Sequence, residues 1–267
     1  MRKQALLSVQ DELVRRDFAG AAEYAHLYEG SASYAHFFNE RLRRVLEAIA
    51  PLSGGKVLEV GCGPGILLSR LRSSKLELYG LDRCPEMIAE AKKRTAGASV
   101  KLTVGRGQQL PFEDQSFDVV LALGVLEYLP ELKEGLNEIA RVAKPNAVIV
   151  VSMLNVLSLY RSWERFVYFP WRDSRFVLHR KTDAKPLLRL HSRKSLVGLM
   201  RTCDLEPLDV TYYDVNICVP PFDSQYPQRT ATLNRWIEVH SGRWSSCLVH
   251  TAFILTARRQ ISLVRAA

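Results

Sequence analysis

The stretch that decides the fold reads Lys56-Val57-Leu58-Glu59-Val60-Gly61-Cys62-Gly63-Pro64-Gly65-Ile66-Leu67-Leu68-Ser69-Arg70-Leu71. A short apolar run ends in three glycines spaced by two, and an amphipathic pattern follows at once. This order predicts a buried strand, a tight turn and the start of a helix. Because glycine has no side chain, such a turn brings backbone N–H groups and a helix N-terminus close to a ligand.

The alternation continues along the chain on both sides of this turn. Short apolar runs predict strands, and stretches with helical spacing of apolar residues predict helices. The expected strands are 56–60, 76–81, 100–104, 117–123, 147–153, 205–215 and 248–257, and the expected helices are 65–72, 85–94, 132–142, 192–200 and 230–239. Strands that alternate with helices at this spacing predict an α/β protein with a mostly parallel sheet covered on both faces.

Charge is unevenly distributed along the 267 residues. Lys and Arg number 37 against 28 Asp and Glu, which gives a net charge of +9. Within residues 161–194, ten basic residues stand against three acidic ones and are interleaved with Trp, Phe and Tyr. Such a segment indicates a negatively charged partner or substrate, a peripheral membrane contact, or a solvated basic face, and the sequence leaves these alternatives open.

The cysteines and the hydropathy of the sequence indicate the cellular compartment in which the protein works. The five cysteines are an odd number without Cys-x-x-Cys spacing, so neither a disulfide framework nor a zinc site is indicated, and no other metal cluster is evident. No apolar run approaches the ~20 residues of a membrane helix. Asp11 and Glu12 follow Arg2 and Lys3 too closely for a signal peptide. We therefore expect a cytoplasmic protein that uses no metal.

The glycine turn is compatible with two kinds of nucleotide site, one for a dinucleotide and one for a ligand that contains a single nucleoside. A dinucleotide-binding fold requires Gly-x-Gly-x-x-Gly with an acid about 20 residues further on. Here the third glycine is Gly65, and Ile66 stands where that pattern has its last glycine. Asp82 suits either kind of site, because a carboxylate at the end of the second strand can accept both ribose hydroxyls. Glu59, two residues before the first glycine, is a second distinctive feature.

Four ordered motifs resemble those of class I S-adenosylmethionine-dependent methyltransferases. Residues 59–65 are similar to the first motif of that family, and residues 82–87 resemble its second, an acid and a short turn into a helix with Met. Residues 110–120 resemble the Leu-Pro-Phe … Phe-Asp-x-Val run before the fourth strand. Residues 126–130 stand where many members have Leu-Glu-His. The resemblance covers about 50–155 and points to small-molecule enzymes typified by quinone biosynthesis.

The resemblance implies a Rossmann-like, seven-stranded, mostly parallel sheet with helices on both faces, an N-terminal helical cap and C-terminal cap insertions. We expect this division of the chain: a helical cap at 1–50, an S-adenosylmethionine-binding core at 51–153, a basic aromatic cap insertion at 154–190, and the C-terminal part of the core sheet at 191–267, with an irregular insertion at 215–245.

The resemblance also implies which residues bind S-adenosylmethionine and its product S-adenosylhomocysteine. Glu59 orders the turn and the methionine amino group, Asp82 holds the ribose, and Met87 packs beside the adenine or the ribose. Gly107 and Gln108 meet the adenine. The full expected cofactor set is Glu59, Gly61, Cys62, Gly63, Gly65, Asp82, Arg83, Met87, Gly107, Gln108 and Leu123.

One position departs from the family pattern. Relatives commonly carry Gly-Asp-Ala before the Leu-Pro-Phe run, and the acid accepts a hydrogen bond from the adenine amino group. This chain has Arg106 at that place, and a guanidinium has only donors. The acceptor therefore comes from the amide oxygen of Gln108 or Gln109, or the adenine is held mainly by apolar contacts.

Methyl transfer requires alignment of the nucleophile, the methyl group and the sulfur, and a base assists when the nucleophile carries a proton. The best-placed candidates for a catalytic role are Glu127 and Tyr128, directly after the expected fourth strand. His179 and His191 follow, if the C-terminal cap folds over the site. Tyr128 in place of His argues against the His-based mechanism of some relatives.

The acceptor has to be inferred from the caps. Aromatic residues and arginines there predict a small or lipid-like, amphipathic or acidic acceptor, with Tyr24, Tyr28 or Tyr34 near the methionine end of the cofactor. One alternative is a methyltransferase-like binding or scaffold protein without turnover, motivated by Arg106 and Tyr128. A nucleic-acid methyltransferase is the other. We do not expect nucleic acid, because no Asn-Pro-Pro-aromatic motif follows the fourth strand. The sequence does not distinguish O-, N- and C-methylation, nor an oligomeric state.

Overall fold

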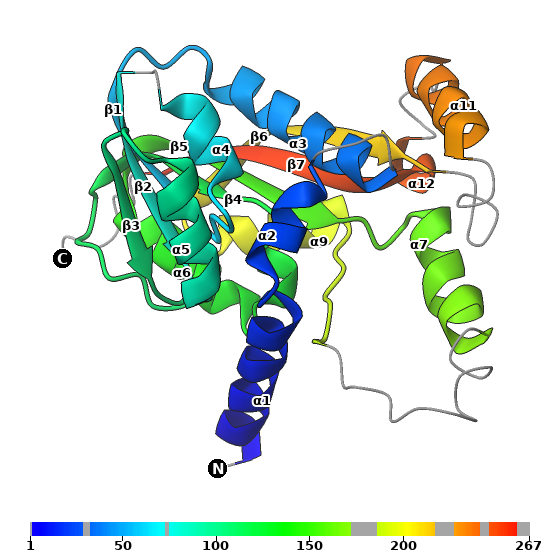
Figure 1. The fold of residues 1–267 in the computed structure, drawn as a ribbon, viewed down its shortest axis with the longest axis horizontal. Helices are drawn as coiled ribbons and strands as arrows, with labels where there is room; N and C mark the ends of the chain where they lie inside the picture. Colours follow the sequence, from blue (N-terminus) through cyan, green and yellow to red (C-terminus); the bar gives the residue numbers. More distant parts are fainter. Residues whose placement is uncertain are drawn as a thin grey trace.

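The computed structural model describes residues 2–28, 33–72, 75–171, 186–216, 227–240 and 246–260. They form an α/β fold in which a twisted sheet is covered by helices (Figure 1). Some sequence expectations lie outside the described residues, namely His179, the side chain of Tyr34 and parts of the expected insertions at 154–190 and 215–245.

Within the described residues, seven strands form one sheet in the order β3-β2-β1-β4-β5-β7-β6. β1 to β5 run parallel, whereas β7 is antiparallel to both β5 and β6. The expectation of a seven-stranded, mostly parallel sheet is confirmed. The strands are β1 (Gly55–Val60), β2 (Leu76–Asp82), β3 (Val100–Val104), β4 (Phe117–Ala122), β5 (Ala143–Leu154), β6 (Leu205–Val215) and β7 (His250–Arg259).

The strand order reverses at β1, and this reversal positions the site. From β1 the chain continues to β2 and β3 on one side of the sheet, while β4 and β5 lie on the other side. The segments that leave the carboxyl ends of β1 and β4 therefore diverge and leave a crevice between them. β5 begins at Ala143, four residues before the expected start, because Ala143 pairs with Phe117 ahead of a register shift.

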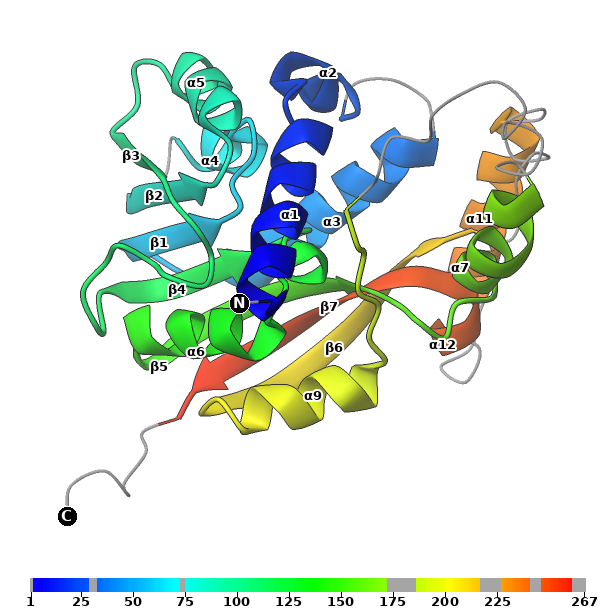
Figure 2. The same cartoon turned by 90° about the horizontal axis from the view of Figure 1, so that it is seen from below.

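Helices cover both faces of the sheet (Figure 2). On one face Val45, Ile66 and Ile88 belong to a core that also contains Val57 and Leu121 of the central strands. On the other face a second core contains apolar residues of α6 and α9 together with residues of β4, β5 and β7. The covering helices are α3 (Ser33–Ile49), α4 (Ile66–Leu71) and α5 (Pro85–Arg94) on the first face, and α6 (Leu132–Val142) and α9 (Arg193–Arg201) on the second.

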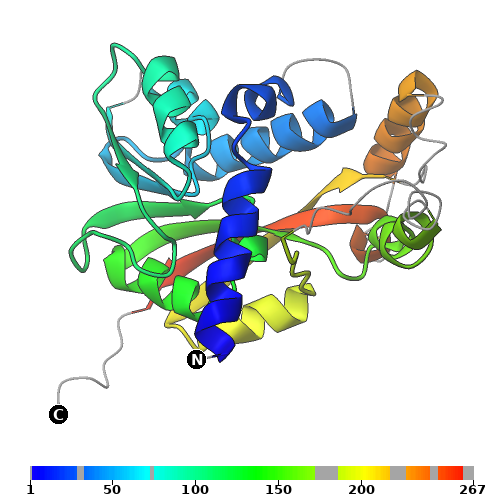
Figure 3. The ribbon, with the colours of Figure 1, turned by 60° about the horizontal axis from the view of Figure 1, so that its bottom comes forward.

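Two further helices precede α3 at the N-terminal end. They are α1 (Arg2–Asp17) and α2 (Ala21–His26), and Figure 3 shows α1 crossing in front of the middle strands. Ala21 packs with Cys84 and Met87 at the start of α5, and Phe18 and Tyr24 cover this cluster. The N-terminal segment is thereby fixed beside the carboxyl ends of β1 and β2.

Some of the helices that follow β5 gather at the far end of the sheet, beyond β6 and β7 (Figures 1 and 2). They are α7 (Leu159–Trp163), the π-helical turn η2 (Glu164–Tyr168), α11 (Pro227–His240) and α12 (Ser246–Val249). Across the part of the chain that the structure describes, every helix is too short or too polar to cross a bilayer.

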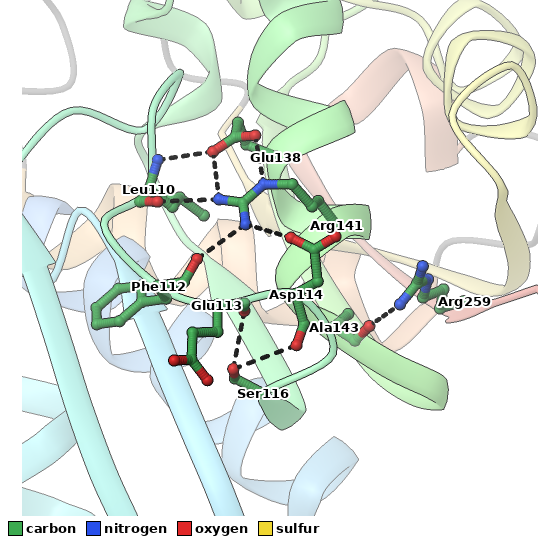
Figure 4. Close-up of polar contacts among 9 residues, drawn as sticks. All are labelled: Leu110, Phe112, Glu113, Asp114, Ser116, Glu138, Arg141, Ala143 and Arg259. Atoms are coloured by element: carbon green, nitrogen blue, oxygen red, sulfur yellow. Dashed lines mark hydrogen bonds and ion pairs between the residues drawn. The ribbon is translucent and has the colours of Figure 1, made fainter.

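Arg141 on α6 fixes the loop that precedes β4 (Figure 4). Its Nη2 donates to the carbonyl oxygen of Leu110 at 2.9 Å, and its Nη1 donates to that of Phe112 at 2.8 Å. Glu138 forms two hydrogen bonds with the same guanidinium and also accepts from the backbone N–H of Leu110 at 2.8 Å. A planar, permanently charged fork suits this task, since it reaches several oxygens at once. The Leu-Pro-Phe run is thereby held on α6.

Candidate functional site

A cleft opens at the carboxyl ends of β1, β2 and β4, where the strand order reverses. Its floor is the glycine turn, and its walls come from the N-terminal helices, the start of α5, the loop after β3 and the segment after β4. The lining residues are Val14, Phe18, Tyr24, Tyr28, Phe38, Arg41, Leu42, Glu59, Val60, Gly61, Cys62, Gly63, Pro64, Ile66, Leu67, Leu81, Asp82, Arg83, Cys84, Met87, Gly105, Arg106, Gly107, Gln108, Leu123, Gly124, Val125, Tyr128 and Leu129.

The glycine turn has the geometry that its spacing predicts. Gly61, Gly63 and Gly65 all adopt positive φ angles, of 71°, 52° and 74°. Such angles are unfavourable for residues with a Cβ. Gly65 is not a lining residue. It starts α4, where a Cβ would lie 3.0 Å from the Cβ of Ala91 on α5. Its role is therefore the close approach of two helices.

Asp82 ties the glycine turn to the end of β2. Its Oδ2 accepts from the backbone N–H of Gly63 and its Oδ1 from that of Cys84, both at 2.9 Å. Burial raises the pKa of the Asp82 carboxyl above its ordinary value, and the hydrogen bonds from the two backbone N–H groups offset part of this rise. Each oxygen keeps a second lone pair, and the side chain faces the cleft. Asp82 can therefore order the turn and still accept from a ligand's hydroxyl groups.

At the other end of the cleft, a buried carboxyl group, that of Glu59, and a buried guanidinium, that of Arg41, interact electrostatically. Glu59 is 5% exposed, and its Oε2 has no hydrogen-bond partner in the described part of the chain. Burial raises the pKa of Glu59 to about 8, although the charge of Arg41 lowers it. Arg41, on α3, is 6% exposed and donates to the hydroxyl of Tyr28 at 3.0 Å. Buried polar atoms are rarely left without partners, so a ligand with both charges suits this end.

Gly124 makes room for Arg41. This residue lies two positions after the end of β4 and has a φ of 69°. There is no space for a Cβ at this position, because an ideal Cβ would overlap Nη1 of Arg41. The backbone N–H of Gly124 donates to the hydroxyl of Ser152 on β5 at 2.8 Å. The guanidinium of Arg41 therefore packs against the backbone of Gly124, just after the carboxyl end of β4.

Aromatic rings enclose the cleft beside these charges. Phe18 contacts Tyr24 and Tyr128 edge-on, with ring centroids 5.5 and 5.2 Å apart. Tyr28 stacks on Phe38 at 4.6 Å. Burial raises the pKa of Tyr24 and of Tyr128 well above the ordinary value, so both phenols stay neutral at physiological pH. The wall is apolar with neutral hydroxyls, which suits a planar or apolar group of a second ligand.

The far end of the cleft is formed by the segment after β3. Gly105, Arg106, Gly107 and Gln108 line it, whereas Gln109 is exposed and does not. Of the two glutamines considered from sequence, only Gln108 is therefore placed to offer an amide oxygen. Met87 at the start of α5 also lines this region and is 2% exposed.

The four candidate catalytic residues are placed very differently. Tyr128 lines the cleft. Glu127 is buried and is not among the lining residues, its Oε2 has no hydrogen-bond partner among the described residues, and burial raises its pKa to about 7. His191 lies away from the cleft, beside Asn155 and Ser195, and burial lowers its pKa. His179 lies outside the described residues.

The cleft brings together every residue of the expected cofactor set except Gly65. Sequence reasoning missed Arg41, Phe18 and Phe38. Arg41 had a detectable signal, because it falls on the same helical face as Phe38 and Val45 and so is a charge inside an apolar stripe. In the described residues, no group of three or more His, Cys, Asp or Glu side chains is placed to hold a metal ion.

Parts of the chain are similar in sequence to known proteins. Residues 58–151 match the family model of the methyltransferase domain. A ubiquinone biosynthesis O-methyltransferase of Azorhizobium caulinodans is 32% identical over 110 residues, which are 40% of this chain and 44% of that protein. A demethylmenaquinone methyltransferase of Staphylococcus aureus is 38% identical over 112 residues, 40% of this chain and 46% of that protein. The chain thus spans less than half the length of the curated relatives it matches.

Solved structures extend the likeness to the whole described fold. A magnesium protoporphyrin IX methyltransferase from Synechocystis, with bound S-adenosylhomocysteine, aligns with a TM-score of 0.64 over 94% of this chain and 100% of that chain, at 15% identity. The chain thus has the α/β fold of these methyltransferase structures, with a cleft at the carboxyl ends of β1, β2 and β4. Within the chain, residues 58–151 match the methyltransferase domain and are similar to the ubiquinone biosynthesis O-methyltransferase and the demethylmenaquinone methyltransferase named above.

Proposed function

We propose that this protein is an S-adenosylmethionine-dependent methyltransferase that acts on a small, lipid-like acceptor. The observation that carries the proposal is the charge pattern of one cleft. A buried carboxyl with an unpartnered oxygen, Glu59, and a buried guanidinium, Arg41, stand at one end. The glycine turn runs between them and a carboxylate, Asp82, which accepts from the backbone N–H of Gly63 and lines the same cleft. An amino acid joined to a nucleoside has this sequence of groups.

The residues of the cleft fit that cofactor group by group. We assign the ammonium of the methionine moiety to Glu59 and its carboxylate to Arg41, which pairs with planar anions through two N–H groups. Asp82 accepts from the ribose hydroxyls, and Gln108 with Met87 borders the adenine. Arg83, Cys62 and Leu123 complete the contact surface. The bound cofactor supplies an electrophilic methyl group on a sulfonium.

The acceptor lies, in this proposal, against the aromatic wall of Phe18, Tyr24, Tyr28, Phe38 and Tyr128. These rings bury an apolar or planar acceptor and exclude water from the transfer. The two curated relatives are named for ubiquinone biosynthesis and for demethylmenaquinone, which supports a quinone-like, amphipathic acceptor for this chain. An acidic group on the acceptor is a further part of the proposal, favoured by the basic composition of 161–194.

We assign proton removal from the acceptor to Glu127 rather than to Tyr128 or His191. A base works best with a pKa near the operating pH, and that of Glu127 is raised by burial to about 7. Tyr128 is a neutral phenol whose pKa burial raises well above that range, so it orients the acceptor. Neither Glu127 nor His191 lines the cleft, but Glu127 directly precedes the lining residue Tyr128, whereas His191 lies beside Asn155 and Ser195.

The experiment that tests this function has two steps. Calorimetric titration with S-adenosylhomocysteine should show one site, and the Asp82→Asn variant should weaken it. Turnover is then followed as transfer of a labelled methyl group to quinol-type and phenolic acceptors. Binding without turnover on any acceptor would support the alternative of a scaffold protein, and absence of binding at millimolar ligand would contradict both. Transfer to nucleic acid instead would support the remaining alternative.

Two proposals concern the setting of this reaction. We propose a cytoplasmic location, supported by Cys62, Cys84, Cys203 and Cys247, which are free thiols. The segment 161–194 is proposed to contact the membrane that dissolves a lipid-like acceptor.

A further inference from the structure

Exposed apolar side chains are concentrated at the far end of the sheet. In the described residues, sixteen large apolar side chains are exposed, and eleven of them belong to α7, η2 and their flanks, to α11 or to α12. We call these eleven the aromatic face. They are Val156, Leu157, Leu159, Trp163, Phe166, Val167, Phe169, Trp171, Leu233, Trp236 and Leu248.

Separate segments of the chain build this face. α12 contacts α7 and the end of β6, and α11 also contacts β6. Figures 1 and 2 show α7, α11 and α12 at the same end of the molecule. An apolar groove lies between Leu159, Trp163, Phe166 and Val167 on one side and Leu248 with Val249 on the other. Monomeric proteins seldom expose so many neighbouring apolar side chains without a partner.

The charge of the neighbouring sequence indicates the partner. Residues 161–194 carry ten basic and three acidic residues in the sequence, and the basic residues in the part that the structure describes are Arg161, Arg165, Arg189, Arg193 and Lys194. One of the three acids, Glu164, is buried and pairs with Arg161 at 2.9 Å. Arg165 lies over the ring of the exposed Phe166, with 5.7 Å from its guanidinium carbon to the ring centroid. A second copy of this chain would carry the same positive charge, which disfavours a symmetric dimer through this face.

We propose that the aromatic face docks this protein on a membrane surface that contains anionic phospholipid. Trp, Phe and Leu side chains insert at the level of the headgroups, and the basic surplus is attracted by the negative surface. The face shares no residue with the cofactor cleft, so docking does not depend on the proposed methyl transfer. The face also extends beyond segment 161–194, because Trp236 and Leu248 come from α11 and α12.

Sedimentation with phospholipid vesicles tests the proposal. The wild type should bind phosphatidylglycerol-containing vesicles, bind pure phosphatidylcholine vesicles at least about tenfold more weakly, and be released by salt. Phe166→Ser and Trp236→Ser should each weaken binding by about tenfold, since each removes a large exposed apolar group from the interface. Leu208→Ser, an exposed position on β6 that is 56% accessible, is the matched control and should bind as the wild type does.

Titration with S-adenosylhomocysteine separates this proposal from the proposed function. Its affinity should be the same in all four proteins, because none of the changed residues lines the cleft. Failure of the wild type to bind anionic vesicles would overturn the docking proposal, whatever the cofactor titration shows. So would equal binding by Phe166→Ser, Trp236→Ser and the wild type. A dimer in light scattering that Phe166→Ser dissociates would assign the face to self-association instead.

Discussion

Gly124 and Arg41 lie 83 positions apart in the sequence but are in contact in the structure. The guanidinium of Arg41 packs so closely on Gly124 that it would overlap a Cβ at this position. This contact joins α3 of the N-terminal segment to the carboxyl end of β4. It places a buried cation within the electrostatic reach of Glu59, and it explains why the second position after β4 is a glycine with positive φ.

Gly124→Ala should displace Arg41. We expect a loss of stability of about 1–2 kcal/mol from the left-handed backbone, together with weaker S-adenosylhomocysteine binding. Thermal unfolding and calorimetric titration measure the two effects. Gly198→Ala on α9 is the matched control, because nothing lies within 4 Å of its ideal Cβ and φ is not positive there. It should stabilise the protein by about 1 kcal/mol and leave binding unchanged. Unchanged binding in Gly124→Ala would contradict the role given to the contact.

Arg41→Leu should lower the affinity for S-adenosylhomocysteine roughly 10- to 100-fold, the worth of a hydrogen-bonded charge pair. The comparison ligand is 5′-methylthioadenosine, which lacks the amino acid end. Its affinity should not change, because Arg41 is assigned to the methionine carboxylate alone. Arg41→Lys should recover part of the affinity as a point charge. An equal loss for both ligands would show instead that Arg41 acts through the fold of the cleft.

Binding of S-adenosylhomocysteine should release a proton at neutral pH. The pKa of Glu59 is raised by burial to about 8, so this carboxyl is mostly protonated in the free protein. The ligand's ammonium favours the ionised form, so binding lowers that pKa and expels about one proton. Affinity should therefore rise with pH until Glu59 is already ionised. Titrations in two buffers of different ionisation enthalpy measure the release, and Glu59→Gln should abolish it. Release that persists in Glu59→Gln would assign the proton to another group.

Arg141→Met should destabilise the protein by about 2 kcal/mol, because the carbonyl oxygens of Leu110 and Phe112 and the carboxylate of Glu138 lose a charged donor. Urea unfolding measures this loss. Arg43→Met is the control, because the Arg43 side chain is half-exposed and its ion pairs with Glu40 and Glu47 should contribute less than about 1 kcal/mol. Equal costs for the two variants would contradict a special role of the loop anchor.

Glu127→Gln and Tyr128→Phe should separate the base from the orienting residue. In the wild type at saturating S-adenosylmethionine, kcat/KM for the acceptor should rise with pH and level off above the pKa of Glu127, about 7. Glu127→Gln should lose this dependence and about 100-fold or more in kcat, the usual contribution of a positioned base. Tyr128→Phe should keep the pH profile and change KM more than kcat. A profile that survives in Glu127→Gln would remove Glu127 from proton transfer.

Local pattern predicted most of the fold. Gly61, Gly63 and Gly65 adopt positive φ angles that are unfavourable for residues with a Cβ, and short apolar runs predict the strands. The start of β5 was misplaced, because its first residues pair with Phe117 only through a register shift in the neighbouring strand. Gly65 likewise lies outside the cleft lining, since it packs on Ala91 across two helices.

The sequence by itself determined the class of this protein, because the strand, the glycine turn and Asp82 are local features whose physical meaning depends on near neighbours. Tertiary structure alone decided which distant residues complete the cleft. Arg41 and Gly124 meet only when α3 packs on the sheet, and the aromatic face exists only because α7, α11 and α12 converge. Such contacts arise from three-dimensional packing between segments far apart in the chain, and no local pattern encodes them.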